Sequence, residues 1–129
     1  MNKSAIIVGS NGQDGTLLYE HLVQQGYGVI GIDKSSWQSN LATPRQAIDI
    51  LNRKQVSDLI SAVKPDEIYY LAAFHQAAEE SFSELAPQEL LEKSLAIHVY
   101  GLLNFLEGIR RHTPQTRLFY AASCLVFGN

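Results

Sequence analysis

The sequence predicts an α/β fold: a doubly wound parallel sheet with helices on both faces. Strand-like and helix-like segments alternate along the chain, an order that implies right-handed crossovers between parallel strands. The first apolar run ends at Val8 and is followed directly by three glycines, Gly9, Gly12 and Gly15. At 129 residues the chain has room for one core, so we expect residues 1–129 to form one domain.

The first strand and the first helix are predicted by an apolar run and by the spacing that follows it. Ser4–Val8 is short and almost continuously apolar, as expected of a buried strand. Gly12–Gln25 has the period of a helix, and Gly26 is expected to end it. Three apolar residues are expected on the inner side of this helix: Leu18, Leu22 and Val23.

A second strand and a second helix are separated by a polar loop. Gly28–Ile32 is predicted to be the second strand. Lys34–Pro44 is rich in Ser, Asn and Pro, which indicates a loop. Gln46–Asp49 could form a short third strand, and Asn52 is expected to cap a helix that runs to about Val63.

The second half of the chain continues the alternation. Pro65 ends the second helix, and Glu67–Ala72 is predicted to be the fourth strand. Glu79–Lys93 is acidic and interrupted by a proline, so we expect an irregular or helical excursion there. A long helix is predicted from about Ser94 to Arg111, followed by a fifth strand at Arg117–Ala122.

The long helix carries two apolar stripes. One face consists of Leu95, Val99, Leu102, Leu106 and Ile109, and three further residues lie off it: Ile97, Tyr100 and Phe105. Either the helix is buried against the sheet by one wide face, or its second stripe contacts another chain, because a helix that is apolar on more than one side needs a second cover.

The glycines after the first strand predict a nucleotide cofactor site. A glycine turn lets the backbone approach a diphosphate, and the helix that follows directs its free N–H groups at the negative charge. Asp33 ends the second apolar run, roughly 20 residues further on, where an acid can bind the ribose hydroxyls. The spacing departs from the usual G-x-G-x-x-G, because Ser10 and Asn11 separate the first two glycines. A tight turn without a ligand is the alternative.

Asp33 favours NAD over NADP as the cofactor. A 2′-phosphate at about 4 Å from an ionised carboxylate would be repelled by roughly 4 kcal/mol per charge pair, at an effective dielectric constant of about 20. Lys34 could offset part of this repulsion, so NADP is the alternative. Asp14 lies near the start of the first helix and competes with a phosphate unless its side chain points away.

Composition and charge exclude several classes of protein. Hydrophobic residues make up 46% of the chain and charged residues 18%, as in a globular protein. The net charge of -3 gives no reason to expect nucleic acid or an anionic membrane as a partner. The single cysteine, Cys124, excludes an intramolecular disulfide framework, and we find no metal-ligand cluster. With no signal peptide or apolar stretch of about 20 residues, we expect a cytoplasmic protein.

The motifs resemble those of the extended short-chain dehydrogenase/reductases, the NAD-dependent epimerase/dehydratase family. The cofactor turn of that family is similar to Gly9-Ser10-Asn11-Gly12-Gln13-Asp14-Gly15, and its Gly-Gln-Asp-Gly ending resembles that of GDP-mannose 4,6-dehydratases in particular. The likeness spans almost the whole chain. Further matching segments are Asp49-Ile50, Lys64–Tyr69, Leu71–Ala73, Ser81-Phe82 and Ala121–Gly128.

The resemblance implies a Rossmann domain, a nucleotide-sugar substrate such as GDP-mannose, and a homodimer formed through the long helix. It gives Ser123 the position of the catalytic Ser/Thr, whose hydroxyl would bind a sugar hydroxyl while hydride leaves for the nicotinamide. The residues expected to bind the cofactor are Gly9, Asn11, Gly12, Gln13, Asp14, Gly15, Asp33, Lys34, Asp49, Ile50, Leu71, Ala72 and Ala73.

The chain also departs from this family. The family's base is a Tyr-x-x-x-Lys pair, and none of the six tyrosines here has a lysine four residues later. We therefore expect the N-terminal part of an enzyme, truncated before the substrate domain and inactive alone. Leu125 stands where the dehydratases have a Glu that drives loss of water. An epimerase or reductase is therefore one alternative, and a non-catalytic dinucleotide-binding module is another.

Overall fold

Within the described part of the chain, five parallel strands form one sheet in the order β3-β2-β1-β4-β5. The computed structural model describes residues 3–10, 12–33, 45–72 and 87–121. The strands are β1 (Ser4–Val8), β2 (Gly28–Asp33), β3 (Arg45–Ala47), β4 (Glu67–Tyr70) and β5 (Arg117–Tyr120).

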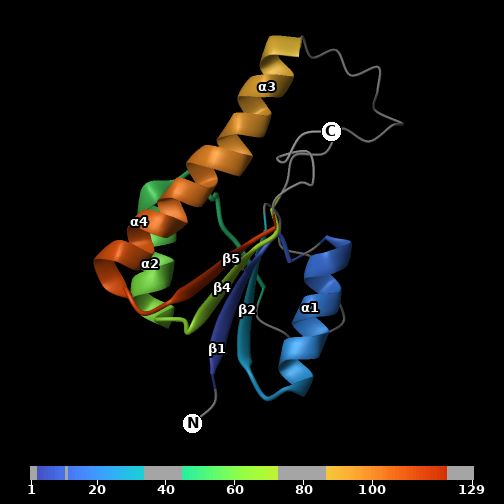
Figure 1. The fold of residues 1–129 in the computed structure, drawn as a ribbon, viewed down its shortest axis with the longest axis vertical. Coiled ribbons are helices and arrows are strands. Elements are labelled where there is room, and N and C mark those ends of the chain that lie inside the picture. Colours follow the sequence, from blue (N-terminus) through green and yellow to red (C-terminus); the bar gives the residue numbers. More distant parts are fainter. Residues whose placement is uncertain (1–2, 11, 34–44, 73–86, 122–129) are drawn as a thin grey trace.

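Helices cover both faces of this sheet, which confirms the predicted doubly wound α/β fold (Figure 1). Helix α1 (Gln13–Gln24) lies on one face, and α2 (Arg53–Val63) and α4 (Leu102–His112) lie on the other. Helix α3 (Pro87–Leu95) leads through a π-helical turn, η2 (Ala96–Gly101), directly into α4. These three segments form the long helix that rises beyond the sheet in Figure 1.

The centre of the sheet determines where a ligand can bind. Strand β1 pairs with β2 on one side and with β4 on the other, and Val8 is aligned with both Ile32 and Tyr70. Because the strands are parallel, the segments that follow β1, β2 and β4 emerge at the same edge. The strand order reverses at β1, and in open α/β sheets such a reversal opens a crevice at the carboxyl ends of the strands.

The core has one layer on each face of the sheet. Ala5 and Ile7 of β1 pack toward α1, whereas Ile6 and Val8 of the same strand pack toward α2 and α4. This alternation reflects the two-residue period of a strand and explains why β1 is apolar throughout. Tyr70 and Phe105 are fully buried in the larger layer, with their ring centroids 5.7 Å apart.

Two of the three residues predicted on the inner side of helix α1, Leu18 and Leu22, pack into the core layer on that side. The structure buries Gly15, Tyr19 and Leu22, while Val23 is exposed. Gly15, Tyr19 and Leu22 are spaced by four and three residues and share one face of the helix, and Val23 lies at the margin of that face. The predicted end of the helix is confirmed, because Gly26 follows it with a φ of +88°.

The long helix begins earlier than predicted and buries a different face. Pro87 is its first residue, since proline fits the first turn, where its missing N–H is not needed. The apolar face described from the sequence is not the buried one as a whole, because Leu95, Val99 and Leu106 are exposed although Ile109 is buried. The buried residues are Ile97, Gly101, Phe105, Gly108 and Ile109.

Two glycines explain this choice of face. A Cβ atom on Gly108 would lie 2.5 Å from Cδ1 of Ile60, and one on Gly101 would lie 2.9 Å from Cδ1 of Ile50. Glycine at these positions lets the helix approach α2 and the core closely. A count of apolar side chains misses such a face, because glycine adds nothing to it.

Strand boundaries shift by one or two residues. Strand β3 is Arg45–Ala47 rather than 46–49, and β4 and β5 end two residues before their predicted ends. The amide of Leu71 still donates to the carbonyl of Val8 at 2.9 Å, so pairing continues just past β4. The expected loop at 34–44 lies outside the described residues, as does most of the expected excursion at 79–93.

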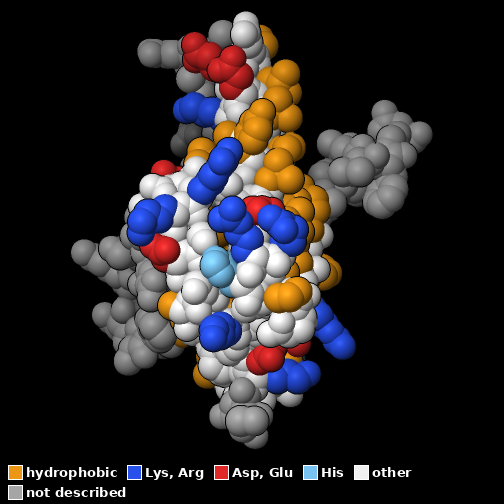
Figure 2. All heavy atoms as spheres, turned by 90° about the vertical axis from the view of Figure 1, so that its left-hand side faces the viewer, with side chains coloured by type: hydrophobic (Ala, Val, Ile, Leu, Met, Phe, Trp, Pro, Cys, Tyr) orange, Lys and Arg blue, Asp and Glu red, His pale blue; other side chains and the backbone are white. Residues whose placement is uncertain are grey.

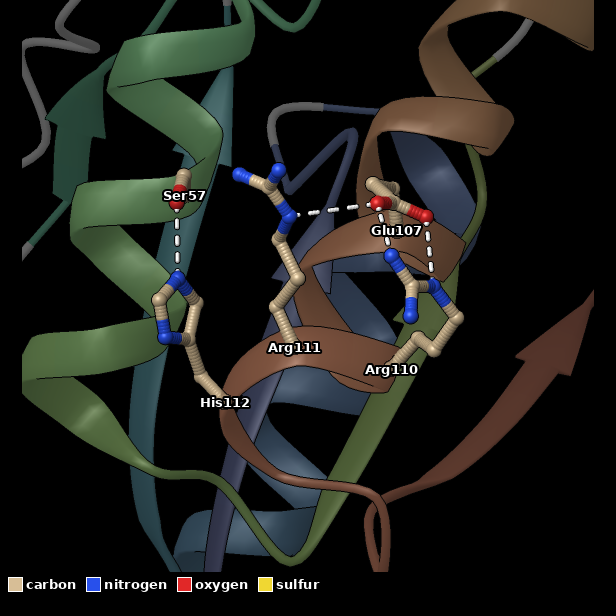
Figure 3. A network of polar contacts seen from close by, with 5 residues as sticks. All are labelled: Ser57, Glu107, Arg110, Arg111 and His112. Carbon is tan, nitrogen blue, oxygen red and sulfur yellow. Dashed lines mark hydrogen bonds and ion pairs between the residues drawn. The ribbon is translucent and has the colours of Figure 1, made fainter.

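The C-terminal turn of α4 carries a polar network (Figure 3). Arg110 donates twice to the carboxylate of Glu107, at 2.6 and 2.9 Å, and Arg111 lies 3.2 Å from the same carboxylate. Arg110 lowers the pKa of Glu107 through these hydrogen bonds. Nε2 of His112 lies 2.8 Å from the hydroxyl of Ser57, which links α4 to α2. Basic side chains here complement the negative end of the helix.

Candidate functional site

A cleft of about 900 Å³ opens at the carboxyl ends of β1, β2 and β4. It brings together most of the residues predicted to bind a cofactor: Gly9, Gly12, Gln13, Asp14, Gly15, Asp33, Asp49, Ile50, Leu71 and Ala72. The other predicted site residues are outside the described part of the chain: Asn11, Lys34, Ala73 and Ser123. Segments far apart in the sequence therefore line one concave surface of the size typical of small-molecule sites.

Gly9 begins the turn after β1 and cannot be replaced without strain. Its φ of +88° lies in the region that favours glycine. A Cβ atom at this position would lie 2.9 Å from the backbone nitrogen of Ala72. The turn thus packs directly against the segment that follows β4, and it exposes backbone rather than side chain toward the cleft.

Ser10 fixes the turn from beneath. It is fully buried, and its amide and hydroxyl both donate to the carbonyl of Ile32, at 3.2 and 3.3 Å. The amide of Gly9 donates to the same carbonyl at 2.9 Å, and Thr16 donates from its hydroxyl to the carbonyl of Ser10 at 3.2 Å. Neither Ser10 nor Thr16 was predicted from the sequence to form the site. The position of Ser10, a small polar residue between two glycines of the turn, could have indicated its role.

The N-terminus of α1 opens into this turn. Gly12 is the N-cap, and because it has no side chain it cannot cap the helix itself. Its amide donates to the carbonyl of Gly9 at 3.2 Å. A Cβ atom on Gly15 would lie 2.9 Å from Cα of Ser10, so the helix sits tightly on the turn. Since the first N–H groups of a helix have no partner within it, this end is suited to bind an anion.

The second wall of the cleft comes from the segment between β3 and α2. Oδ1 of Asp49 accepts from the amide of Leu51 at 3.0 Å, while the amide of Asp49 donates to the side chain of Gln55 at 2.9 Å. Asn52 caps α2, as predicted, by accepting from the amide of Gln55 at 3.1 Å. These bonds hold Asp49 and Ile50 at the rim of the cleft.

Charge is unevenly distributed among the described residues that line the cleft. Three are acidic, Asp14, Asp33 and Asp49, and one is basic, Lys93. Lys93 comes from α3, together with Ala96 and Ile97 of η2. This wall was not predicted, because the long helix was expected to begin only at about Ser94. Proline at position 87 was the signal that could have placed the beginning of the helix correctly.

Other functional features are absent from the described residues. No group of three or more His, Cys, Asp or Glu residues there could hold a metal ion. Among the same residues, no helix has the length and apolar character needed to cross a membrane.

Comparison with known proteins gives one matching family model. Residues 5–129 match the model of the NAD dependent epimerase/dehydratase family. The chain is 30% identical over 149 residues to GDP-mannose 4,6 dehydratase 2 of Arabidopsis thaliana, and 31% identical over 139 residues to a GDP-mannose 4,6-dehydratase of Vibrio cholerae. These alignments cover 98% and 95% of this chain but 38% and 36% of the relatives, so the chain spans well under half of their length.

Solved structures share the fold at lower sequence identity. UDP-glucose-4-epimerase from Stenotrophomonas maltophila, with bound NAD and formylated UDP-arabinopyranose, has a TM-score of 0.79 at 19% identity and is matched over 99% of this chain and 39% of its own. The Bordetella bronchiseptica enzyme WbmH, in complex with NAD+, has a TM-score of 0.76 at 20% identity, over 99% of this chain and 42% of its own. At this level of identity the similarity establishes the Rossmann-like fold alone.

Proposed function

The chain belongs to the NAD dependent epimerase/dehydratase family, and from that premise we propose that its cleft binds NAD as part of a nucleotide-sugar-modifying enzyme. The observation that carries the proposal is the union of the Gly9 turn, the α1 N-terminus and Asp33 in one cleft. A bare backbone beside a helix N-terminus suits a diphosphate, and an acid at the end of the next strand suits a ribose.

The described residues fit a dinucleotide along the whole cleft. In the proposed arrangement, the diphosphate lies against the turn from Gly9 to Gly15, where an added Cβ on Gly9 or Gly15 would collide with backbone. The adenosine half lies between Asp33 and the Asp49–Ile50 pair. The nicotinamide half lies beside Leu71 and Ala72. We include Asn11, Lys34 and Ala73 among the proposed cofactor-binding residues because of their positions in the sequence motifs.

Asp33 is the basis for proposing NAD rather than NADP. It lines the cleft and ends β2, where its carboxylate would meet a 2′-phosphate. The mutual repulsion of two ionised groups at contact is worth several kcal/mol at moderate dielectric constant. Calorimetric titration of the protein with NAD and NADP tests this, and tighter binding of NADP would contradict it.

For the reaction, we propose a nucleotide-sugar dehydratase most similar to the GDP-mannose 4,6-dehydratases. Its support is the identity of about 30% to these enzymes and the Gly-Gln-Asp-Gly ending of the turn. A bound nicotinamide would accept hydride from the sugar and return it. Ser123 is proposed to hold the reacting sugar hydroxyl by a hydrogen bond. Because no tyrosine in the chain precedes a lysine by four residues, we expect no turnover by residues 1–129 alone.

An epimerase or reductase is the second candidate, and Leu125 favours it. A leucine cannot move the proton that the elimination of water requires, and it stands where the dehydratases have a Glu. A non-catalytic dinucleotide-binding module is the third candidate. Assay of the complete gene product with GDP-mannose and with UDP-sugars separates the three. Loss of water from GDP-mannose supports the first, inversion or reduction of a sugar supports the second, and binding of NAD without turnover of any sugar supports the third.

A homodimer is proposed for the long helix. Figure 2 shows hydrophobic side chains in a band along the upper part of the molecule. The seam consists of Leu91, Leu95, Val99, Leu102 and Leu106, spaced by three or four residues, and all but Leu102 are more than 40% exposed. Acidic side chains, Glu89 and Glu92, lie near its beginning, and Arg110 and Arg111 lie at its end. An antiparallel second copy would cover the seam and bring these oppositely charged ends of the helix near each other.

A further inference from the structure

The π-helical turn η2 contributes to the lining of the cleft. A π-helix shifts the backbone out of α-helical register and occurs frequently at functional sites. Here the shift falls where the long helix meets the cleft, since Ala96 and Ile97 both line it. The hydroxyl of Tyr70 contacts this turn.

Tyr70 is the last residue of β4 and is fully buried beneath η2. Its hydroxyl donates a hydrogen bond to the carbonyl of Ile97. A Cβ atom on Gly101 would collide with this hydroxyl, so glycine is what leaves room for the bond. Burial raises the pKa of Tyr70, which keeps the hydroxyl protonated and able to donate.

Further along the long helix, Gly101 and Asn104 contact Ile50, which lines another wall of the cleft. Nδ2 of Asn104 donates to the carbonyl of Ile50 at 2.8 Å, and Cδ1 of Ile50 lies 2.9 Å from the Cβ position of Gly101. Both hydrogen bonds thus join a residue outside the cleft to one that lines it. Through them the end of β4, η2 and the segment after β3 are linked into one unit.

We propose that Tyr70 is a positioning residue for the dinucleotide cleft: its hydrogen bond to Ile97 fixes η2 in the conformation that a cofactor needs. The proposal rests on the proposed function for the identity of the ligand. The apparent affinity of a site is reduced by the fraction of molecules in which the site is formed correctly. Without the Tyr70 hydroxyl, η2 would sample other registers, and that fraction would fall.

The test compares Tyr70→Phe with Thr116→Val. Thr116 is also buried, and its hydroxyl donates to the carbonyl of Pro65 at 2.6 Å, at the opposite end of the sheet from the cleft. Each variant therefore removes one buried hydroxyl that bonds a carbonyl, and both are expected to lower Tm. In calorimetry only Tyr70→Phe should raise the Kd for NAD, roughly two- to tenfold, the range that one neutral hydrogen bond is worth.

Amide hydrogen exchange gives a second measurement that needs no ligand. Residues 96–101 should exchange faster in Tyr70→Phe than in Thr116→Val. Equal NAD affinity of Tyr70→Phe and the wild type, or equal weakening by both variants, would overturn the proposal. If Tyr70→Phe does not fold, Asn104→Ala tests the same unit through Ile50 and should also raise the Kd. If the wild type binds no NAD, the proposed function fails, and unchanged exchange at 96–101 is then the result that rejects the role of Tyr70.

Discussion

A Cβ atom added to Gly9 would lie 2.9 Å from the backbone nitrogen of Ala72, so the turn after β1 touches the chain just beyond β4. We predict that Gly9→Ala destabilises the protein and abolishes binding of NAD. A non-glycine residue held at positive φ costs about 1–3 kcal/mol, and the contact with Ala72 adds to that cost. Thermal unfolding and calorimetric titration with NAD measure the two effects.

Gly26 provides a matched control for this variant. It has the same φ of +88°, but an added Cβ would meet nothing within 4 Å. Gly26→Ala should therefore show the conformational cost alone and leave binding of NAD unchanged. An equal loss of stability in both variants would mean that the close approach of Gly9 to Ala72 does not matter.

Asp33 is predicted to set the preference between the two dinucleotides. Asp33→Asn removes the charge that would repel a 2′-phosphate, so the ratio of NADP to NAD affinity should rise by about tenfold or more. Asp14→Asn is the control, because Asp14 lines the cleft near the α1 N-terminus. Neutralising Asp14 should raise the affinity for NAD and for NADP by the same factor. If the ratio of NADP to NAD affinity is the same in Asp33→Asn as in the wild type, Asp33 does not determine the preference for NAD.

The exposed seam of the long helix is predicted to hold two copies together. Leu95→Glu combined with Leu106→Glu places charge at two exposed seam positions and should give a monomer in analytical ultracentrifugation. Leu17→Glu is the control, since Leu17 is 59% exposed on α1, on the other side of the sheet. A wild-type protein that is monomeric at all concentrations would contradict the proposed dimer.

The features that could be predicted from the sequence are those that depend on neighbouring residues. The β1 strand, the glycine turn and the Asn52 cap each depend on a few consecutive side chains, and the structure has all of them. Asp33 could be placed because it ends an apolar run that had to be a strand. Parallel pairing then brings the ends of β1, β2 and β4 to one edge, so the cleft follows from local signals.

The features that could not be predicted depend on distant contacts. Ser10 bonds the carbonyl of Ile32, and Tyr70 bonds that of Ile97, 27 residues further on. The buried face of the long helix contains Gly101 and Gly108, which leave room for the side chains of Ile50 and Ile60. Apolar periodicity favoured the leucine seam instead. Apolar residues with helical spacing indicate a face that packs against something, but they do not indicate whether it packs against the sheet or against another chain.

Two tyrosines bond Glu67, and they are predicted to make the stability of the protein depend on pH in the alkaline range. Tyr69 donates to Oε2 of Glu67 at 2.6 Å and Tyr27 donates to Oε1 at 3.1 Å. Burial, together with the hydrogen bond to Glu67, raises the pKa of Tyr69 from 10.0 to about 12. The folded state therefore keeps a proton that the unfolded chain loses. The stabilisation that results is fully present below pH 10 and is lost as the pH rises toward 12.

Tyr69→Phe tests this directly, because it keeps the ring and removes the titrating hydroxyl. Its Tm should fall less steeply than that of the wild type between pH 10 and 12, the interval that the pKa shift of Tyr69 defines. Leu118→Val is the control, since Leu118 packs in the core layer on the other face of the sheet from Tyr69 and carries no proton. That variant should lower Tm by the same amount at every pH. Parallel curves for wild type and Tyr69→Phe across this interval would show that Tyr69 ionises alike in the folded and unfolded states.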